Sequence, residues 1–193
     1  MGMDRLGWIL ASSSPRRHDL LREAGIPFSA VVPDVEEWDT RTHPELSPAE
    51  LVLANARRKA MAVWQENDAR PILAADTLVV CRGRVLGKPA DLEEAVGMLQ
   101  WLSGQTHEVI TGVAWVRGRE IRETIVRTCV TFRALDKAAI QGYLARVDVL
   151  DKAGAYALQE EGSRIVERIE GSRSNVVGLP MEKILDWWRE SQE

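Results

Sequence analysis

The sequence predicts an α/β fold with a mixed sheet. Helix-like and strand-like stretches alternate along the chain, a pattern typical of this class. Two glycine-centred turns, Arg82-Gly83-Arg84 and Arg117-Gly118-Arg119, predict hairpins and therefore antiparallel pairs in the sheet. At 193 residues and 45% hydrophobic content, the chain can bury a substantial core. No repeat, low-complexity tract or flexible linker divides it, so we expect a single domain over residues 1–193, with at most a small lobe.

Apolar and β-branched runs predict the strands, and apolar residues at helical spacing predict the helices. The predicted strands are 8–11, 28–32, 72–75, 78–81, 109–116, 121–132, 154–158 and 164–169. The predicted helices are 15–24, 48–66, 92–102, 137–146 and 180–191. Residues 32–48 are the loosest part of the chain, and 171–180 predict a polar loop that leads into the last helix.

The start of the first predicted helix carries an unusual charge. Ser14 suits its N-cap and Pro15 its first position, which places Arg16 and Arg17 in the first turn. A helix N-terminus favours acids, and the other helix starts at 47–50, 91–94 and 136–140 carry them. A phosphate bound at this end would explain the two arginines. Chance is the alternative, since only five of the 25 basic residues are lysine.

Charge and cysteine usage exclude several classes of protein. The net charge of -4 argues against a nucleic-acid binder, which normally carries a basic excess on one face. No signal segment and no run of about 20 apolar residues is present, so we expect a cytoplasmic protein without a membrane partner. Cys81 and Cys129 lack ligand or redox spacing and are interpreted as core residues in a reducing compartment. The three histidines share no metal-ligand spacing.

Asp76 follows a buried-looking strand and is a candidate for chemistry. Its apolar flanks predict partial desolvation, which requires a cation, a metal or hydrogen bonds in compensation. Glu36 and Glu37 could complete a divalent-metal site with Asp76, because Mg²⁺ takes one or two carboxylates together with phosphate oxygens. The alternative is an aspartate that caps the turn after its strand.

Two later stretches are also suited to a nucleotide. Lys88 lies in the rigid turn Gly87-Lys88-Pro89 and could contact a phosphate, although a solvated turn lysine is the alternative. In residues 151–159 small side chains permit close approach to the backbone, and the Gln159 amide suits recognition of a nucleobase edge. No Walker loop, dinucleotide-binding glycine pattern, HExxH motif or nucleophile elbow is present.

Taken together and in order, these stretches resemble the Maf family of nucleoside triphosphate pyrophosphatases. The resembling segments are Leu10 to Arg17, Ala75-Asp76-Thr77, Gly87-Lys88-Pro89, Met98-Leu99 with Leu102-Ser103-Gly104, His107 to Gly112, Asp151 to Gln159, and Val176 to Pro180. Ala74 and Arg173 depart from the family pattern, and Arg173 could alter the loop near the substrate.

The resemblance implies an elongated, two-lobed mixed-sheet fold with a central cleft, related to the inosine triphosphate pyrophosphatases. It implies hydrolysis of a nucleoside triphosphate between the α and β phosphates, giving a monophosphate and pyrophosphate. It also implies a divalent cation, Mg²⁺ or Mn²⁺, and a homodimer.

The resemblance also assigns roles to residues. Asp76 maps to the proton acceptor. Apart from the resemblance, Asp76 and Glu37 are the predicted metal ligands. The residues mapped to substrate binding are Ser12, Ser14, Arg16, Arg17, Lys59, Thr77, Lys88 and Gln159. Of these, Arg16, Thr77 and Gln159 map to base selection.

The branch resembled acts on dTTP and UTP. The related branch that acts on 7-methyl-GTP carries Trp at the position of Arg16 and an acid near that of Gln159, and this chain has neither. Two alternatives stay open: a 7-methyl-GTP pyrophosphatase, and a nucleotide-binding regulator of septum formation with little catalysis. Whether Asp76 is a base or a metal ligand also stays open.

Overall fold

A computed structural model describes residues 7–64 and 70–192, and it confirms the predicted α/β class with a mixed sheet. In this part of the chain the sheet order is β2-β1-β3-β5-β6-β7, with β4 beside β3. The strands are β1 Trp8–Ala11, β2 Phe28–Val31, β3 Ile72–Cys81, β4 Arg84–Leu86, β5 Thr106–Arg117, β6 Glu120–Phe132 and β7 Val166–Glu170. The helices are α1 Pro15–Glu23, α2 Pro48–Val63, α3 Leu92–Leu102, α4 Lys137–Leu144, α5 Gly162–Ile165, α6 Arg173–Val177 and α7 Met181–Glu190, with a 3-10 turn, η1, at Ala153–Ala155.

The chain divides into two compact units. Unit 1 comprises Met1–Asp76, Thr111–Val126 and Gly178–Glu193, and unit 2 comprises Thr77–Ile110 and Arg127–Val177. Strands β3, β5 and β6 each contribute residues to both units.

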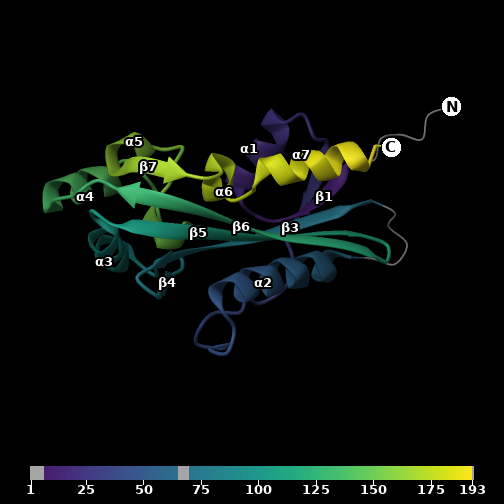
Figure 1. Ribbon diagram of the computed structural model, residues 1–193, viewed down its shortest axis with the longest axis horizontal. Helices are drawn as coiled ribbons and strands as arrows, with labels where there is room; N and C mark the ends of the chain where they lie inside the picture. The colour runs from purple at the N-terminus through teal and green to yellow at the C-terminus, as the bar shows by residue number, and fades with distance from the viewer. Residues whose placement is uncertain (1–6, 65–69, 193) are drawn as a thin grey trace. The chain divides into compact units, whose positions relative to one another are not determined.

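In unit 1, β1 pairs in parallel with β2 and with the first half of β3. All four residues of β1 are buried, as expected for a parallel strand covered on both faces. Helix α2 covers one face of these strands, and α1 and α7 cover the other (Figure 1). A Cβ atom on Gly112 of β5 would lie 2.6 Å from the Leu53 amide nitrogen, so only glycine lets α2 pack this closely on the sheet.

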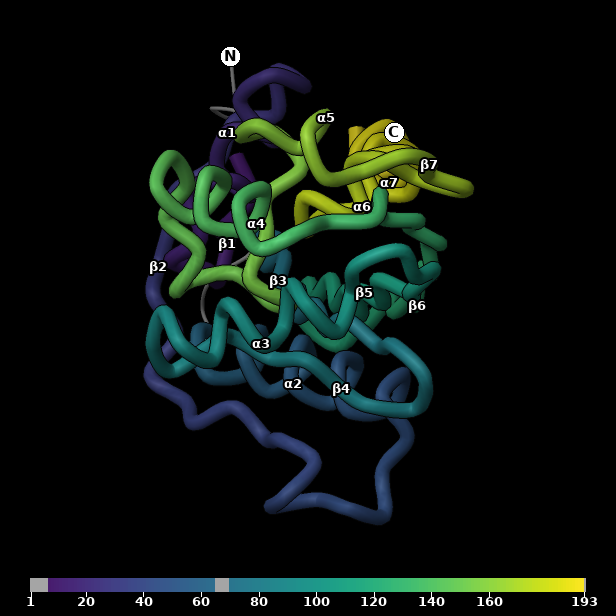
Figure 2. The backbone as a smooth tube through the Cα atoms, turned by 90° about the vertical axis from the view of Figure 1, so that its left-hand side faces the viewer, coloured from purple at the N-terminus to yellow at the C-terminus, as the bar shows by residue number. Residues whose placement is uncertain are grey.

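The loose segment between β2 and α2 forms a long loop of unit 1 (Figure 2). The capping box predicted at the start of α2 is confirmed, with Ser47 and Glu50 exchanging hydrogen bonds. Helix α2 ends at Val63, and residues 65 and 66 of the predicted helix lie outside the described residues.

In unit 2, α3 packs against α4 and η1 around a core that includes Phe132 and Tyr156. The acidic N-caps predicted for α3 and α4 are confirmed, because Asp91 and Asp136 each accept a backbone N–H bond. Cys81 is buried in this core, as expected, whereas the prediction of a core position for Cys129 was wrong because it is half-buried.

Two predicted elements were wrong, and the predicted strand 164–169 is confirmed with a later start. The stretch 154–158 is no strand, because Gly154 and Ala155 both take positive φ, 72° and 59°, and form the end of η1. Residues 162–165 form a short helix, and β7 begins only at Val166. The loop predicted at 171–180 contains the short helix α6.

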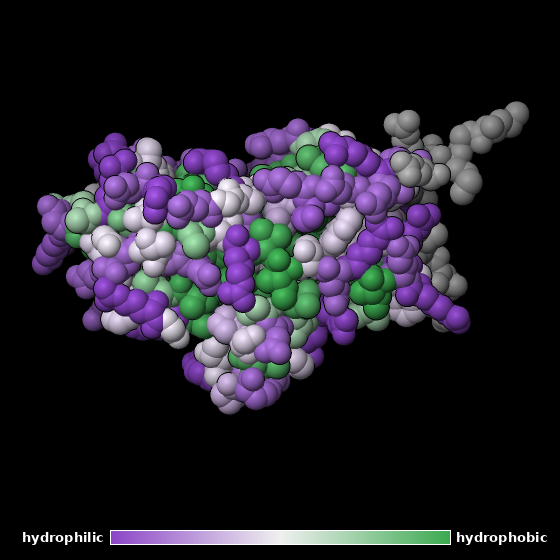
Figure 3. All heavy atoms as spheres, viewed as in Figure 1, coloured by the Kyte–Doolittle hydropathy of each residue, from purple (hydrophilic) through white to green (hydrophobic). Residues whose placement is uncertain are grey.

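Apolar residues that reach the surface are surrounded by hydrophilic ones on the face drawn in Figure 3. Among the described residues, no helix combines the length and the apolar composition that a membrane span requires.

His107 is a buried structural residue in unit 2, only 2% exposed. Its Nε2 lies 2.9 Å from the Tyr156 hydroxyl, and its ring packs edge-on against Phe132. Its Nδ1 meets no hydrogen-bond partner in residues 7–64 and 70–192. Burial therefore lowers the pKa of His107 from 6.5 to about 4, because a protonated ring would place an unsatisfied N–H in the core.

This histidine should make the protein lose stability in acid. Between pH 6.5 and about 4 the unfolded chain binds a proton at His107 that the folded chain does not, so the free energy of unfolding falls as the pH falls. The expected loss across this window is about 3 kcal/mol. Urea unfolding of the wild type and of His107→Gln at several pH values measures it. The variant should show a shallower pH dependence, and equal slopes would contradict the prediction.

Candidate active site

Asp76 lies in the middle of β3, not at the end of a strand. The structure joins the two predicted strands 72–75 and 78–81 into one, so the interpretation of Asp76 as a turn cap was wrong. Asp76 is 7% exposed, in a strand whose first five residues are all buried. A carboxylate at such a position requires charged or hydrogen-bonding partners.

Helix α2 supplies those partners. The Lys59 ammonium, on a residue only 6% exposed, donates to Asp76 Oδ1 at 2.8 Å and to the Ala75 carbonyl at 3.4 Å. Asn55 Nδ2 donates to Asp76 Oδ2 at 3.0 Å. Both carboxylate oxygens of Asp76 are therefore held from one helix, by residues one turn apart.

Glu37, from the loop between β2 and α2, joins the same cluster. Its Oε1 lies 2.7 Å from Lys59 Nζ, while its side chain is 45% exposed. No group of three or more His, Cys, Asp or Glu side chains is placed to hold a metal ion within residues 7–64 and 70–192. Glu37 and Asp76 nevertheless meet around one ammonium, and two carboxylates are the hard-oxygen donors that Mg²⁺ or Mn²⁺ takes when phosphate oxygens complete its shell.

The basic helix start lies in unit 1 with this cluster. The predicted N-cap position of Ser14 is confirmed, but its hydroxyl caps no amide of α1, and its N–H donates to Ser12 Oγ at 3.1 Å. Arg17 Nε donates to the Gly178 carbonyl at 2.9 Å, and its Nη1 donates to Ser12 Oγ at 3.3 Å. The first and the last of the resembling segments therefore meet at Arg17.

The charges of Asp76 and Glu37 also affect the pKa of Arg17. Burial lowers the pKa of its guanidinium, and the charges of Asp76 and Glu37 oppose that shift. Arg16, also half-buried, adds a like charge that lowers the pKa of Arg17 further. Arg17 and Lys59 thus lie near two carboxylates, and Arg16 adds a third positive charge beside Arg17, which suits a polyanionic ligand.

Thr77, Lys88 and Gln159 belong to unit 2. The Gly154 N–H donates to the Gly87 carbonyl at 3.0 Å, so the Lys88 turn lies beside the 151–159 segment. Gly154 also packs on Val79, where a Cβ atom would lie 3.1 Å from a side-chain carbon. The close approach predicted from the small residues is therefore confirmed.

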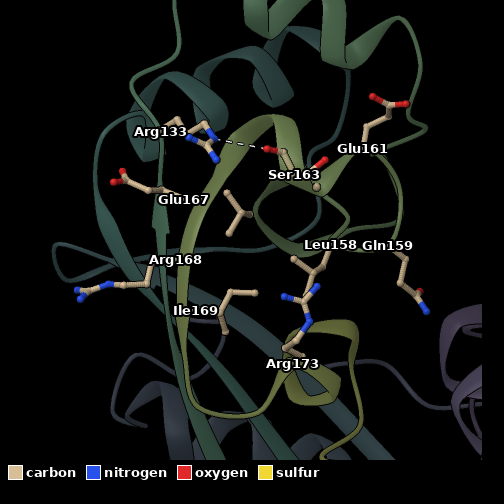
Figure 4. A pocket seen from close by; sticks show the side chains of 11 residues that line it. Arg133, Leu158, Gln159, Glu161, Ser163, Glu167, Arg168, Ile169 and Arg173 are labelled. Atoms are coloured by element: carbon tan, nitrogen blue, oxygen red, sulfur yellow. Dashed lines mark hydrogen bonds between the residues drawn. The ribbon is translucent and has the colours of Figure 1, made fainter.

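Gln159 and Arg173 both line a pocket of about 340 Å³ in unit 2 (Figure 4). The Arg173 guanidinium lies near Leu158, whereas the exposed Gln159 amide points away from it (Figure 4). Arg173, one of the two residues that depart from the family pattern, therefore lines the same pocket as Gln159, which is predicted to select the base.

Sequence reasoning missed Asn55. The sequence feature that could have identified Asn55 is its spacing from Lys59. The two residues are four apart, among the buried Val52, Ala56 and Ala60 of α2. Two polar residues at this spacing on an apolar helix face indicate a shared buried partner.

The fold and this cluster define an α/β protein with a buried carboxylate centre on its sheet. The family described as Maf-like protein matches residues 7–191, and this chain belongs to it. A protein of Akkermansia muciniphila named dTTP/UTP pyrophosphatase is 48% identical over 177 residues, 92% of each chain. Proteins with the same name from Symbiobacterium thermophilum and Bacillus cereus are 49% and 45% identical, over 91% and 92% of this chain and 89% and 86% of their own.

Proposed function

We propose that this protein hydrolyses dTTP and UTP to the nucleoside monophosphate and pyrophosphate. Membership of the Maf family and three relatives named dTTP/UTP pyrophosphatase support this activity. The observation that carries it is the buried Asp76 carboxylate, which is held by Asn55 and Lys59 in a cluster that also contains Arg17.

In the proposed reaction Asp76 orients a water molecule and accepts its proton. The water oxygen bonds to the α-phosphorus, the bond from this phosphorus to the bridging oxygen breaks, and the electron pair leaves with pyrophosphate. Arg16 and Arg17, together with Lys88, neutralise the charge that develops on the leaving group. Preorganised cations of this kind supply much of the rate of phosphoryl chemistry.

A divalent cation, Mg²⁺ or Mn²⁺, belongs to the proposal. Asp76 and Glu37 would hold it, and when bound it would polarise the phosphate oxygens. Lys59 bridges the same two carboxylates in the structure and keeps them together despite their like charges.

Ser12, Ser14 and Lys59 remain proposed substrate-binding residues, and Arg16, Thr77 and Gln159 remain proposed determinants of base choice. The cytoplasmic location and the homodimer implied by the family resemblance are proposals as well.

Substrate choice tests the proposal. We expect kcat/KM for dTTP and UTP to exceed that for 7-methyl-GTP by about tenfold or more, because a hydrogen-bonding pocket strongly rejects bases with the wrong donors and acceptors. The measurement is pyrophosphate release by the purified protein with Mg²⁺, with each nucleotide in turn.

The products separate the alternatives. Release of orthophosphate would contradict cleavage between the α and β phosphates. A preference for 7-methyl-GTP would assign the protein to the related branch, and binding without turnover would favour the regulatory alternative.

A further inference from the structure

The Asn55 side chain makes three hydrogen bonds, one to Asp76 and two to the backbone of Trp38. Its Nδ2 donates to Asp76 Oδ2 at 3.0 Å and to the Trp38 carbonyl at 2.9 Å. Its Oδ1 accepts the Trp38 backbone N–H at 2.8 Å. The side chain of Asn55 therefore links Asp76 of β3 to Trp38, the residue that follows Glu37.

Such a buried amide is costly unless its partners are fixed. Asn55 is 2% exposed, and burying an amide without hydrogen bonds is strongly unfavourable. An apolar residue would continue the buried face of α2 formed by Val52, Ala56 and Ala60. The polar side chain at this buried position is therefore explained by its hydrogen bonds to Asp76 and Trp38. The hydrogen bond to the Asp76 carboxylate is of the stronger, charge-assisted kind.

The loop that carries Glu37 is held on both sides of that residue. Arg58 Nη2 donates to the Glu36 carbonyl at 3.3 Å, and Asn55 holds both backbone groups of Trp38. The Arg58 guanidinium also lies 4.5 Å from the centre of the Trp38 ring. Because the loop contains no helix or strand near Glu37, these contacts with α2 fix where its carboxylate meets Lys59.

We propose that Asn55 is a positioning residue of the hydrolytic reaction, which sets the separation of the Asp76 and Glu37 carboxylates so that together they hold a divalent cation. It acts through both carboxylates, because its side-chain hydrogen bonds go to Asp76 and to the backbone of the residue after Glu37. The inference rests on the proposed function, because it assigns the two carboxylates to that cation.

The test measures metal binding separately from turnover. Protein-bound Mn²⁺ is titrated by electron paramagnetic resonance in the presence of α,β-imido-dUTP, an analogue that cannot be cleaved between the α and β phosphates. We expect Asn55→Ala and Asn55→Leu, whose side chain has the same branched shape as asparagine, to raise the Mn²⁺ dissociation constant about 10 to 100-fold, as for other residues that orient metal ligands. kcat for dTTP should fall, while its KM at saturating Mn²⁺ stays within about threefold, because the Asn55 side chain holds Asp76 and the Trp38 backbone and is assigned to the carboxylates, not to the nucleotide.

Asn175 provides the matched control. It is equally buried, and its Nδ2 donates to the Val109 carbonyl at 3.1 Å and to Thr128 Oγ1 at 3.0 Å, within unit 2. Asn175→Ala should lower the thermal midpoint but leave the Mn²⁺ dissociation constant within about twofold, because the hydrogen bonds that its Nδ2 donates go to Val109 and Thr128 and hold neither carboxylate.

Two results would overturn the inference: Mn²⁺ affinity unchanged in folded Asn55→Leu, or an equal loss of affinity in Asn175→Ala. Should Asn55→Ala fail to fold, Asn55→Leu decides the matter, since leucine keeps the branched shape of the side chain and leaves no cavity. The proposed function fails on a different result, the absence of pyrophosphate release by the wild type.

Discussion

Asp76→Asn is expected to reduce the turnover of dTTP by about 10² to 10⁴-fold, the usual effect of removing a general base. The amide has the shape of the carboxylate and can still accept a hydrogen bond from Asn55, and Lys59 keeps its ion pair with Glu37, so the fold should persist. It cannot accept the proton of the attacking water. The measurement is the rate of pyrophosphate release, with circular dichroism and a thermal midpoint to show that the variant is folded.

Glu123→Gln is the matched control for this substitution. Glu123 is another strand carboxylate of unit 1 that pairs with a cation of α2, since Arg57 Nε lies 2.6 Å from its Oε1. This pair lies outside the proposed machinery, and its loss should leave turnover within about twofold. Near-normal turnover of Asp76→Asn would remove Asp76 from the chemistry. A rate restored by high Mg²⁺ would instead make Asp76 a metal ligand and not the base.

The helix starts could be predicted because their chemistry is local. Ser47 with Glu50, Asp91 and Asp136 each satisfy backbone N–H groups within three residues. The two glycine-centred hairpins followed in the same way, because Gly83 and Gly118 take the positive φ that such turns require.

The continuation of β3 through Asp76 could not be predicted from the neighbouring residues alone. Sequence rules place an aspartate at the end of a strand, because a charge in a buried strand is unfavourable. The compensation comes from Lys59 and Asn55, which precede Asp76 by 17 and 21 residues. Pairing at that range depends on how α2 packs on the sheet, and the close approach at Gly112 becomes visible only in the folded chain.

The strand predicted at 154–158, within the segment 151–159, was wrong for a related reason. Alternating small residues read as a strand, but Gly154 and Ala155 turn the backbone into the left-handed region. The contact of Gly154 with Val79 of β3 favours that turn, and a single strand-like pattern does not reveal it. Of the candidate site, the sequence singled out Asp76, Glu37 and the arginines, whereas the connection of the two carboxylates through α2 required the structure.

Lys59→Met is expected to destabilise the protein by about 3 to 5 kcal/mol, the effect of removing one partner of a buried ion pair. The side chains of Lys59 and Asp76 are only 7% and 10% exposed, so the carboxylate would stay buried with its charge uncompensated by the ammonium. Glu37 contributes less, because its half-exposed carboxylate can turn to water. A loss of this size is a large part of the total stability of an ordinary domain, about 5 to 15 kcal/mol. Urea unfolding monitored by circular dichroism measures it.

Two further variants separate charge from packing. Arg57→Met removes an exposed pair from the same helix and should cost no more than about 1 kcal/mol. Adding Asp76→Asn to Lys59→Met removes the uncompensated charge, so the double variant should regain most of the lost stability but none of the turnover. If Lys59→Met and Arg57→Met were equally stable, Lys59 would contribute no more to folding than a surface cation does. If instead the double variant were as unstable as Lys59→Met alone, the lysine would act through the packing of its aliphatic chain and not through its charge.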